Sequence, residues 1–304
     1  MASPANFTLI QLRYFTETAR AGSMTEAARK LHISQPALST AINQLERDLG
    51  VTLLERVPRK GIRMTAAGRQ FHLDAVALLA HAESMRERTG NFGSSLSGVL
   101  RIGIYAPMAP FRAPTLIQAC ARRHPELTLE LVEADHDELV RLLDDQEVDV
   151  GLAYAMAPFE HYKTEVLETI APHAIVPAEH PLASSAAPVS LRQLASDPLI
   201  LLDLPHTASY YVSLFHSAGV EPTVRFRVQG YETVRGLVGS GFGVSVLNQR
   251  VAHDVTYGGT RVVAVPLQGP LPGLDVCLVR RSGQESHRID AFSEICRRLY
   301  SGLR

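Results

Sequence analysis

The stretch "HISQPALSTAINQLERDLG", residues 32–50, restricts more strongly than any other what the first part of this chain can fold into. Ser34 is a good helix N-cap, and Pro36 falls in the first turn, where its missing N–H costs nothing. Apolar residues then recur at helical spacing and form one narrow stripe, made of Leu38, Ile42, Leu45 and Leu49. These residues predict a helix that begins at Ser34 and ends before Gly50.

Two capping-box patterns precede this helix, T-x-x-Q at residues 8–11 and S-x-x-E at residues 23–26. Each is followed by apolar residues at helical spacing, which predicts two more helices, the first ending near Gly22. The short connection before Ser34 is typical of a helix-turn-helix. After Gly50, "VTLLERVPRKGIRMT" places two apolar runs around a basic tip, which predicts a β-hairpin wing.

The face of the third helix opposite its apolar stripe carries short polar side chains. Such groups suit base edges in a major groove, where an amide pairs with adenine. The basic wing, with Arg63 and its neighbours, suits phosphates or the minor groove. A merely solvated face is the alternative for any three-helix domain, and the combination of three helices, a tight turn and a basic wing favours DNA.

Residues 12–71 resemble the N-terminal signature of LysR-type transcriptional regulators. The matching positions are Phe15, Gly22, Ser23, Ala27, Ala28, Leu31, Ser34, Gln35, Pro36, Ala37, Ser39, Ile42, Leu45, Glu46, Leu49, Gly50, Leu53, Arg56, Thr65, Ala67 and Gly68. In that family the Ser-Gln-Pro-Ala stretch opens the recognition helix, so the resemblance implies base contacts there. Together with the basic wing it gives these candidate DNA-binding residues: Ser34, Gln35, Pro36, Ala37, Ser39, Thr40, Asn43, Arg56, Arg59 and Lys60. Many members carry arginine or another long polar residue in place of Thr40, which predicts a shorter contact here.

The charge distribution also points to the N-terminal part. Residues 1–93 hold 12 Lys and Arg against 8 Asp and Glu, a net charge of +4, whereas the rest of the 304-residue chain has a net charge of −5. No run approaches the roughly 20 apolar residues of a membrane helix, and no export signal begins the chain, so we expect a cytoplasmic protein. Cys120, Cys277 and Cys296 are scattered, which predicts buried reduced thiols and no metal site.

A single helical pattern follows from Thr65 to about residue 90. Its apolar positions repeat at spacings of 4, 3, 4 and 3 residues, at Phe71, Ala75, Leu78, Ala82 and Met85. A helix of about 25 residues spans roughly 37 Å, too long for so small a domain to cover. The pattern predicts a homodimer through this helix, as the family resemblance also implies, and packing on the chain's own C-terminal domain is the alternative. Residues 91–98 are predicted to be a flexible hinge.

The remaining two thirds alternate between β-rich runs and amphipathic stretches, which predicts an α/β domain with mostly parallel sheets. The β-rich runs are residues 99–105, 127–134, 148–154, 199–203, 223–229, 242–248 and 273–281. Interruptions near residues 164–172 and 265–274 predict two lobes, with the last strand and helix returning to the first. The resemblance implies an effector-binding domain like type 2 periplasmic binding proteins.

The expected organisation is an all-α winged helix-turn-helix domain, a linker helix, and a two-lobed α/β domain. The boundaries are residues 1–64 for the DNA-binding domain, 65–90 for the dimerisation helix, 91–98 for the hinge and 99–304 for the effector domain. Its first lobe takes residues 99–164 and 267–304, and its second lobe takes residues 165–266.

A ligand in such a domain is expected between the lobes, where loops follow the strand C-termini and free N–H groups attract anions. The candidate ligand-binding residues are Tyr105, Pro107, Met108, His136, Tyr154, Leu204, His206, Thr207, Ser209 and Tyr231, with Phe111 as an apolar wall. Surface exposure or lobe packing is the alternative for each. Family members commonly present a hydroxyl at the position of Pro107 to bind a carboxylate, and proline lacks that donor.

The sequence contains no linear motif for nucleophilic catalysis, so no catalytic residue and no cofactor is predicted. The prediction is a bacterial, homo-oligomeric DNA-binding transcriptional regulator switched by a small molecule, with dimers assembling into a homotetramer and contact with RNA polymerase left open. A solute-binding protein and an enzyme on the same two-lobed fold are the alternatives. The effector, the operator, the regulated genes, the choice between activation and repression, and the choice between dimer and tetramer do not follow from the sequence.

Overall fold

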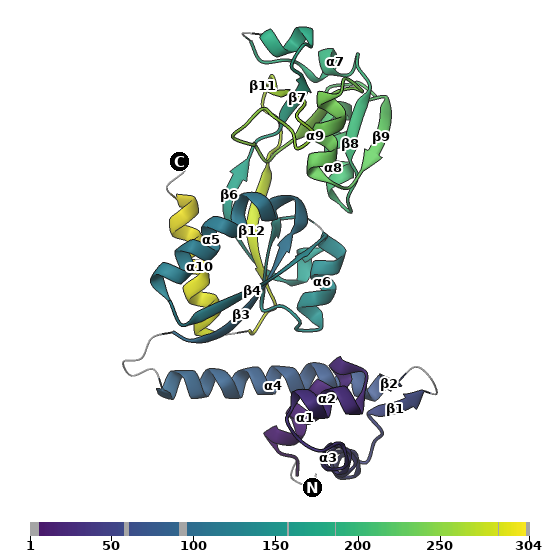
Figure 1. The fold of residues 1–304 in the computed structure, drawn as a ribbon, viewed down its shortest axis with the longest axis vertical. Helices are drawn as coiled ribbons and strands as arrows, with labels where there is room; N and C mark the ends of the chain where they lie inside the picture. The colour runs from purple at the N-terminus through teal and green to yellow at the C-terminus, as the bar shows by residue number, and fades with distance from the viewer. Residues whose placement is uncertain are drawn as a thin grey trace. The chain divides into compact units, whose positions relative to one another are not determined.

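The computed structural model describes residues 6–57, 61–90, 96–156, 158–185, 187–284 and 286–301. Within them, the side chains of residues 56, 57, 80, 83, 84, 86–90 and 301 are not described. The chain divides into two units, one formed by its first 94 residues and one by nearly all of the rest (Figure 1).

The N-terminal unit is helical with one short hairpin. Its elements are α1 (Leu9–Ala21), α2 (Met24–Lys30), α3 (Gln35–Leu49), β1 (Leu54–Val57), β2 (Gly61–Met64) and α4 (Ala66–Gly90). Thr8 and Gln11 form both halves of the predicted capping box. Ser23 also caps its helix, but Glu26 pairs with Arg29 and does not return to the cap. The helix-turn-helix and wing predicted from the sequence are confirmed.

Close backbone contacts hold the hairpin and α4 against the helices. The N–H of Ile62 donates to the carbonyl of Gly22 at 2.8 Å. Gly61 has a φ of 81° and a Cβ there would lie 2.4 Å from the same carbonyl oxygen. A Cβ on Gly68, in the first turn of α4, would lie 2.0 Å from the carbonyl oxygen of Leu53. Both sites therefore require glycine.

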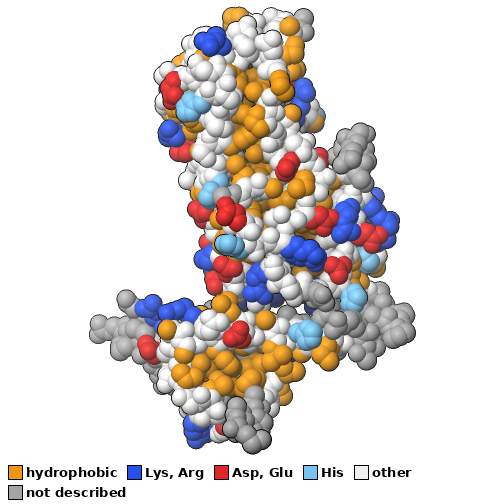
Figure 2. Space-filling view, turned by 180° about the vertical axis from the view of Figure 1, so that it is seen from behind, with side chains coloured by type: hydrophobic (Ala, Val, Ile, Leu, Met, Phe, Trp, Pro, Cys, Tyr) orange, Lys and Arg blue, Asp and Glu red, His pale blue; other side chains and the backbone are white. Residues whose placement is uncertain are grey.

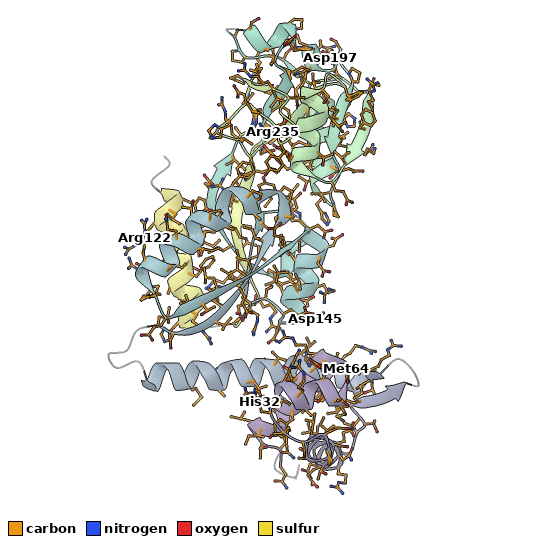
Figure 3. All side chains as sticks on the ribbon, in the orientation of Figure 1. His32, Met64, Arg122, Asp145, Asp197 and Arg235 are labelled. Carbon is orange, nitrogen blue, oxygen red and sulfur yellow. The ribbon has the colours of Figure 1, made fainter. Side chains whose placement is uncertain are left out.

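The turn between α2 and α3 passes through His32, which has a φ of 54° and is labelled in Figure 3. A non-glycine residue in this left-handed region is uncommon and is held there by the surrounding structure. Here the N–H of His32 donates to Arg29 and that of Ile33 to Ala28. These bonds fix the angle at which α3 leaves the turn.

The apolar positions of α4 divide between two roles. Phe71, Ala75 and Leu79 pack on the core of the N-terminal unit, with Leu12 and Phe15. The predicted seam is therefore wrong at Phe71 and Ala75, because the unit's own core uses them. Exposed apolar side chains on α1 and α4 remain, and Figure 2 shows a broad hydrophobic area on one face of this unit. They include Leu9, Ile10, Leu73 and Leu78, between 38% and 62% exposed.

The second unit has two lobes (Figure 1). The first lobe is built on a five-stranded sheet of order β4-β3-β5-β12-β6. Its elements are β3 (Gly98–Tyr105), η1 (Ala106–Met108), α5 (Ala109–Arg123), β4 (Leu127–Ala134), α6 (His136–Asp144), β5 (Val150–Tyr154), η2 (Phe159–His161), β6 (Lys163–Ile170), β12 (Leu274–Arg280) and α10 (His287–Ser301). The last strand and helix thus return to the first lobe, as predicted.

The second lobe contains a three-stranded sheet of order β10-β7-β11 and a parallel pair, β8 and β9. Its elements are β7 (His173–Pro177), η3 (Pro181–Ser184), α7 (Leu191–Leu194), β8 (Leu199–Leu202), α8 (Thr207–Ser217), β9 (Val224–Val228), α9 (Tyr231–Gly239), β10 (Ser245–Leu247) and β11 (Val262–Pro266). Each lobe has its own buried core, and the side chains of Leu204 and Tyr210 pack against both.

Two details of the sequence reading need correction. The five-stranded sheet is mixed, because β12 runs antiparallel to β5 and β6. The three-stranded sheet is antiparallel, because β7 runs antiparallel to both β10 and β11. The interruption expected near residues 164–172 is itself a strand, β6, which belongs to the first sheet. The lobe boundary placed between residues 164 and 165 therefore falls inside a strand, and the chain crosses after Ile170.

Candidate DNA-binding surface and interlobe site

The N-terminal end of α3 is exposed and capped as the sequence predicts. The hydroxyl of Ser34 accepts the N–H of Ala37 at 3.3 Å. Gln35, Pro36 and Ala37 are exposed in this first turn. Among the described residues, no intramolecular hydrogen bond engages the amide of Gln35 or that of Asn43, which is also exposed. Both amides are therefore available to an external partner.

Thr40 and Ser39 are placed differently from these amides. The hydroxyl of Thr40 donates to the carbonyl of Pro36 at 2.9 Å, so its proton is engaged in the helix. Its methyl group and oxygen lone pairs still face outward and suit a thymine methyl or a base donor. Ser39 is half-buried in a cavity of about 250 Å³ against Met24 and Ile62.

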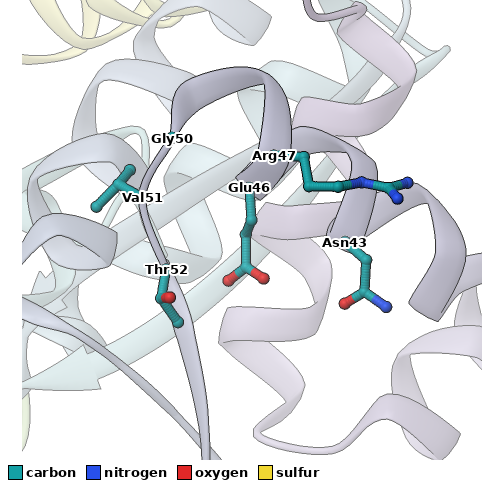
Figure 4. A pocket seen from close by; sticks show the side chains of 6 residues that line it. All are labelled: Asn43, Glu46, Arg47, Gly50, Val51 and Thr52. Atoms are coloured by element: carbon teal, nitrogen blue, oxygen red, sulfur yellow. The ribbon is translucent and has the colours of Figure 1, made fainter.

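The C-terminal half of α3 has a structural role. Gln44 donates to Asp48 at 2.7 Å and accepts from Arg47 at 2.6 Å. The carboxylate of Glu46 accepts the N–H groups of Leu53 and Leu54 at 2.7 and 3.0 Å. Figure 4 shows Glu46 extending from the helix between the Thr52 segment and Asn43. Glu46 therefore fixes the start of the wing relative to α3.

Among the described side chains of the wing, the basic one lies on β2. Arg63 is exposed and lies opposite Glu55 in the strand register. Arg56 pairs with Ile62 through the backbone, and its side chain is not described. The predicted contacts Arg59 and Lys60 lie outside the described residues. The exposed α3 amides and Arg63 thus belong to one compact helix–wing unit.

Among the described residues of the second unit, four hydrogen bonds between two side chains join the lobes. Tyr105 and Thr207 share a buried hydroxyl–hydroxyl bond of 2.6 Å. His206 lies 2.9 Å from the carboxylate of Asp137. The other two bonds both involve Gln249. Its amide nitrogen donates to the Tyr154 hydroxyl at 3.2 Å, and its amide oxygen accepts from Arg112 at 3.3 Å. Several predicted ligand residues therefore hold the lobes together.

Tyr105, His136 and Tyr154 form a buried ring cluster below these bonds. The His136 and Tyr105 ring centroids are 4.3 Å apart, and those of Tyr105 and Tyr154 are 5.3 Å apart. Burial, with a smaller effect from nearby His206, lowers the pKa of His136 to about 4. Burial also raises the pKa of both tyrosines. All three side chains are therefore neutral near pH 7 and fully packed.

The other predicted ligand residues are scattered. Met108 is buried in the core of the first lobe. Leu204 is half-buried between the two cores. Ser209 is exposed and donates its hydroxyl to the carbonyl of His206 at 2.7 Å. Met108, Leu204 and Ser209 therefore do not line one common cavity with Pro107 and Tyr231.

A cavity of about 540 Å³ lies between the lobes. Of the predicted residues, Pro107, Tyr231 and the wall residue Phe111 line it, together with Ala106, Pro110, Gln229, Gly230, Glu232, Thr233, Arg235, Val251, Ala252, His253 and Tyr257. The sequence reading missed the segment at residues 251–257, because that segment follows neither a strand–helix junction nor a recognisable motif.

The charged residues of the cavity compensate each other. Arg235 is 3% exposed and is labelled in Figure 3. Its guanidinium lies 2.7 Å from the carboxylate of Glu232 and donates to the carbonyls of His253 and Val255 at 2.8 and 3.3 Å. Glu232 also accepts the N–H of Tyr257 at 2.7 Å. The Tyr231 hydroxyl donates to the carbonyl of Gln249, and burial raises its pKa.

The three cysteines are buried and free, as predicted. Burial raises the pKa of Cys120 to about 11 and that of Cys277 to about 12, and it raises that of Cys296 further. Their thiols are therefore protonated near pH 7. Within the described ranges, no group of three or more His, Cys, Asp or Glu could hold a metal ion. None of the described helices is long and apolar enough to cross a membrane.

Comparison with known proteins adds to this geometry. Residues 9–69 match the family model for the bacterial regulatory helix-turn-helix protein, lysR family, and residues 93–301 match the LysR substrate binding domain. The chain is 30% identical over 299 residues to a probable cat1 operon transcriptional activator of Acinetobacter lwoffii, covering 96% of each protein. It is 29% identical over 279 residues to a hydrogen peroxide-inducible genes activator of Dickeya chrysanthemi, covering 90% of this chain and 88% of that protein.

A full-length OxyR variant from Pseudomonas aeruginosa has a similar structure, with a TM-score of 0.80 at 27% identity over 96% of this chain and 95% of that one. LysR-type regulators bind DNA and small-molecule effectors and form oligomers. The two relatives are named as activators of transcription, which confirms the regulator prediction over a solute-binding protein or an enzyme. The chain belongs to the family of LysR-type transcriptional regulators.

Proposed function

We propose that this regulator reads its operator through the exposed first turns of α3 and that a small molecule bound between the two lobes changes its action on DNA. The observation that carries the proposal is the pair of unengaged amides, Gln35 and Asn43, on the exposed side of α3. An amide that forms no intramolecular bond has no such bond to break when it exchanges its water for a base edge. The contact residues remain those predicted from the sequence, including Arg59 and Lys60.

The proposed functional form is a homodimer. Two recognition helices match the two half-sites of a palindromic operator. The exposed apolar residues of α1 and α4, such as Ile10 and Leu78, support pairing through this part of the chain, because a monomer would leave them in water. Dimers then associate into a tetramer. Because the protein acts on chromosomal DNA, its place of action in a bacterium is the cytoplasm.

The proposed stimulus is a small molecule bound between the lobes. Oxidation is the other stimulus that the name of the Dickeya chrysanthemi relative suggests. Cys120, Cys277 and Cys296 are buried, and their raised pKa values disfavour the reactive thiolate. A ligand changes the equilibrium only if it binds two arrangements of the oligomer with different affinity. Because two relatives are named as activators, we extend the proposal to activation of transcription, with RNA polymerase as a further partner.

DNase I footprinting of the chain on its own upstream region tests this proposal. The expected result is a protected site with two half-sites about one helical turn of DNA apart. Protection without sequence preference, or protection of a single half-site by a monomer, contradicts it.

A further inference from the structure

The chemistry of the interlobe cavity specifies a ligand class more narrowly than the fold does. Its volume of about 540 Å³ lies within the range of about 300–1,000 Å³ that small-molecule sites occupy. Both lobes contribute, with residues 106–111 from the first lobe and residues 229–235 and 251–257 from the second. A molecule bound here therefore contacts both lobes at once.

The walls of the cavity suit an aromatic ring. Phe111 and Tyr231 meet edge to face across the lobes, with ring centroids 5.2 Å apart and an angle of 75° between the rings. A third ring can pack on the face of one and the edge of the other, which is the favoured aromatic geometry. Pro107 and Pro110 add rigid apolar surface on the side of the first lobe.

The cavity offers no uncompensated charge among its described residues. The guanidinium of Arg235 is engaged by Glu232 and by two carbonyls, and Glu232 in turn accepts a backbone N–H. His253 is exposed to solvent, so water screens its interactions. A cationic ligand would lose hydration here without gaining a free counter-charge.

One polar feature of the cavity is a donor surface. Gly230 begins α9 without any side chain capping the helix, and residues 230–233 line the cavity. The first N–H groups of a helix have no partner within it, so they can donate to a ligand carbonyl. On the opposite wall, Pro107 has neither a hydroxyl nor an N–H. These features suit one hydrogen-bond acceptor on the ligand.

We propose that the interlobe cavity binds an aromatic molecule that carries a hydrogen-bond acceptor, and that it discriminates against ammonium compounds and against non-aromatic molecules of the same size. This inference rests on the proposed function, because it identifies the chemical class of the effector at that site.

Four probes of matched size test the inference on the full chain by isothermal titration calorimetry. Benzamide is neutral and aromatic, benzoate is anionic, benzylamine is cationic, and cyclohexanecarboxamide is neutral without an aromatic ring. Benzamide and benzoate are each expected to bind at least ~10-fold more tightly than benzylamine and cyclohexanecarboxamide, a difference of about 1.4 kcal/mol. Equal or tighter binding of benzylamine or cyclohexanecarboxamide overturns the inference, as does binding of none. This comparison needs no variant.

Two variants then locate the bound probe. Phe111→Ala is expected to weaken benzamide binding at least ~5-fold. Phe226→Ala, which removes another partly exposed ring of the second lobe away from the cavity, is expected to leave it unchanged. Equal effects of the two variants place the probe elsewhere and overturn the inference.

Footprinting of the same wild-type sample on its upstream region separates this inference from the proposed function. Specific protection without selectivity for the aromatic acceptors benzamide and benzoate refutes only the ligand class. Selectivity for these two probes without specific protection refutes the regulatory role.

Discussion

At the scale of single residues, phosphate contacts and base contacts have different signatures. Arg63 is exposed on the wing and carries a full charge, so we expect it to contact the DNA backbone. Arg63→Ala should weaken binding to all sequences alike and reduce the slope of log K against log salt by about 1 per chain. Fluorescence anisotropy over a salt series measures this slope. An unchanged slope, or a loss confined to one sequence, contradicts the assignment.

His136 makes the stability of the effector domain depend on pH. Its pKa is about 4 in the folded chain and about 6.5 when unfolded, so the unfolded state binds more protons between these values. The free energy of unfolding should therefore fall as pH drops from about 6.5 toward 4. His173 is half-buried, and desolvation also lowers its pKa to about 4, so it acts in the same direction. His136→Phe should thus reduce this slope without abolishing it.

Urea unfolding followed by circular dichroism at several pH values between 4 and 7.5 measures the His136 effect. His161→Phe, which changes an exposed histidine, is the matched control and should leave the slope unchanged. Identical slopes for wild type and His136→Phe exclude His136 as a source of the pH dependence.

At the scale of elements, the helix starts were predictable because a cap is a local interaction between neighbouring residues. Ser34 and Pro36 identify the start of α3 by themselves. The direction of β6 and the contacts of Phe71 were not predictable, because they depend on partners far away in the sequence. For the same reason, the ligand prediction found Pro107 and Tyr231 but not the segment at residues 251–257.

The junction of α4 with the wing depends on the absence of a side chain at Gly68. Gly68→Ala should destabilise the N-terminal unit by about 1–3 kcal/mol, because the added Cβ meets the Leu53 carbonyl and the backbone must shift. Gly236→Ala adds the same group to helix α9 where nothing lies within 4 Å. It should be neutral or stabilise by about 0.5–1 kcal/mol. Thermal unfolding followed by circular dichroism compares the two, and equal effects contradict the role of Gly68.

At the scale of the whole molecule, the proposed dimer depends on apolar surface that α4 leaves exposed. Leu78 is 43% exposed, and Leu78→Glu should place a charge in the interface and weaken dimerisation by at least ~10-fold. Ala77→Glu on the adjacent exposed position is the control, since it points about 100° away around the helix. Sedimentation equilibrium measures the mass of each. A monomeric wild type, or equal loss for both variants, contradicts pairing at Leu78.

If α3 reads base sequence with the help of Gln35, the chain must prefer its own upstream region to random DNA. The ratio of Kd values for random DNA and for the upstream region, measured by fluorescence anisotropy at one salt concentration, gives this preference. The wild type is expected to show a ratio of at least ~10³. Gln35→Ala is expected to lower the ratio about 10- to 100-fold, through weaker binding to the upstream region alone. A wild-type ratio near one, or an unchanged ratio in Gln35→Ala, would show that α3 does not read base sequence in this way.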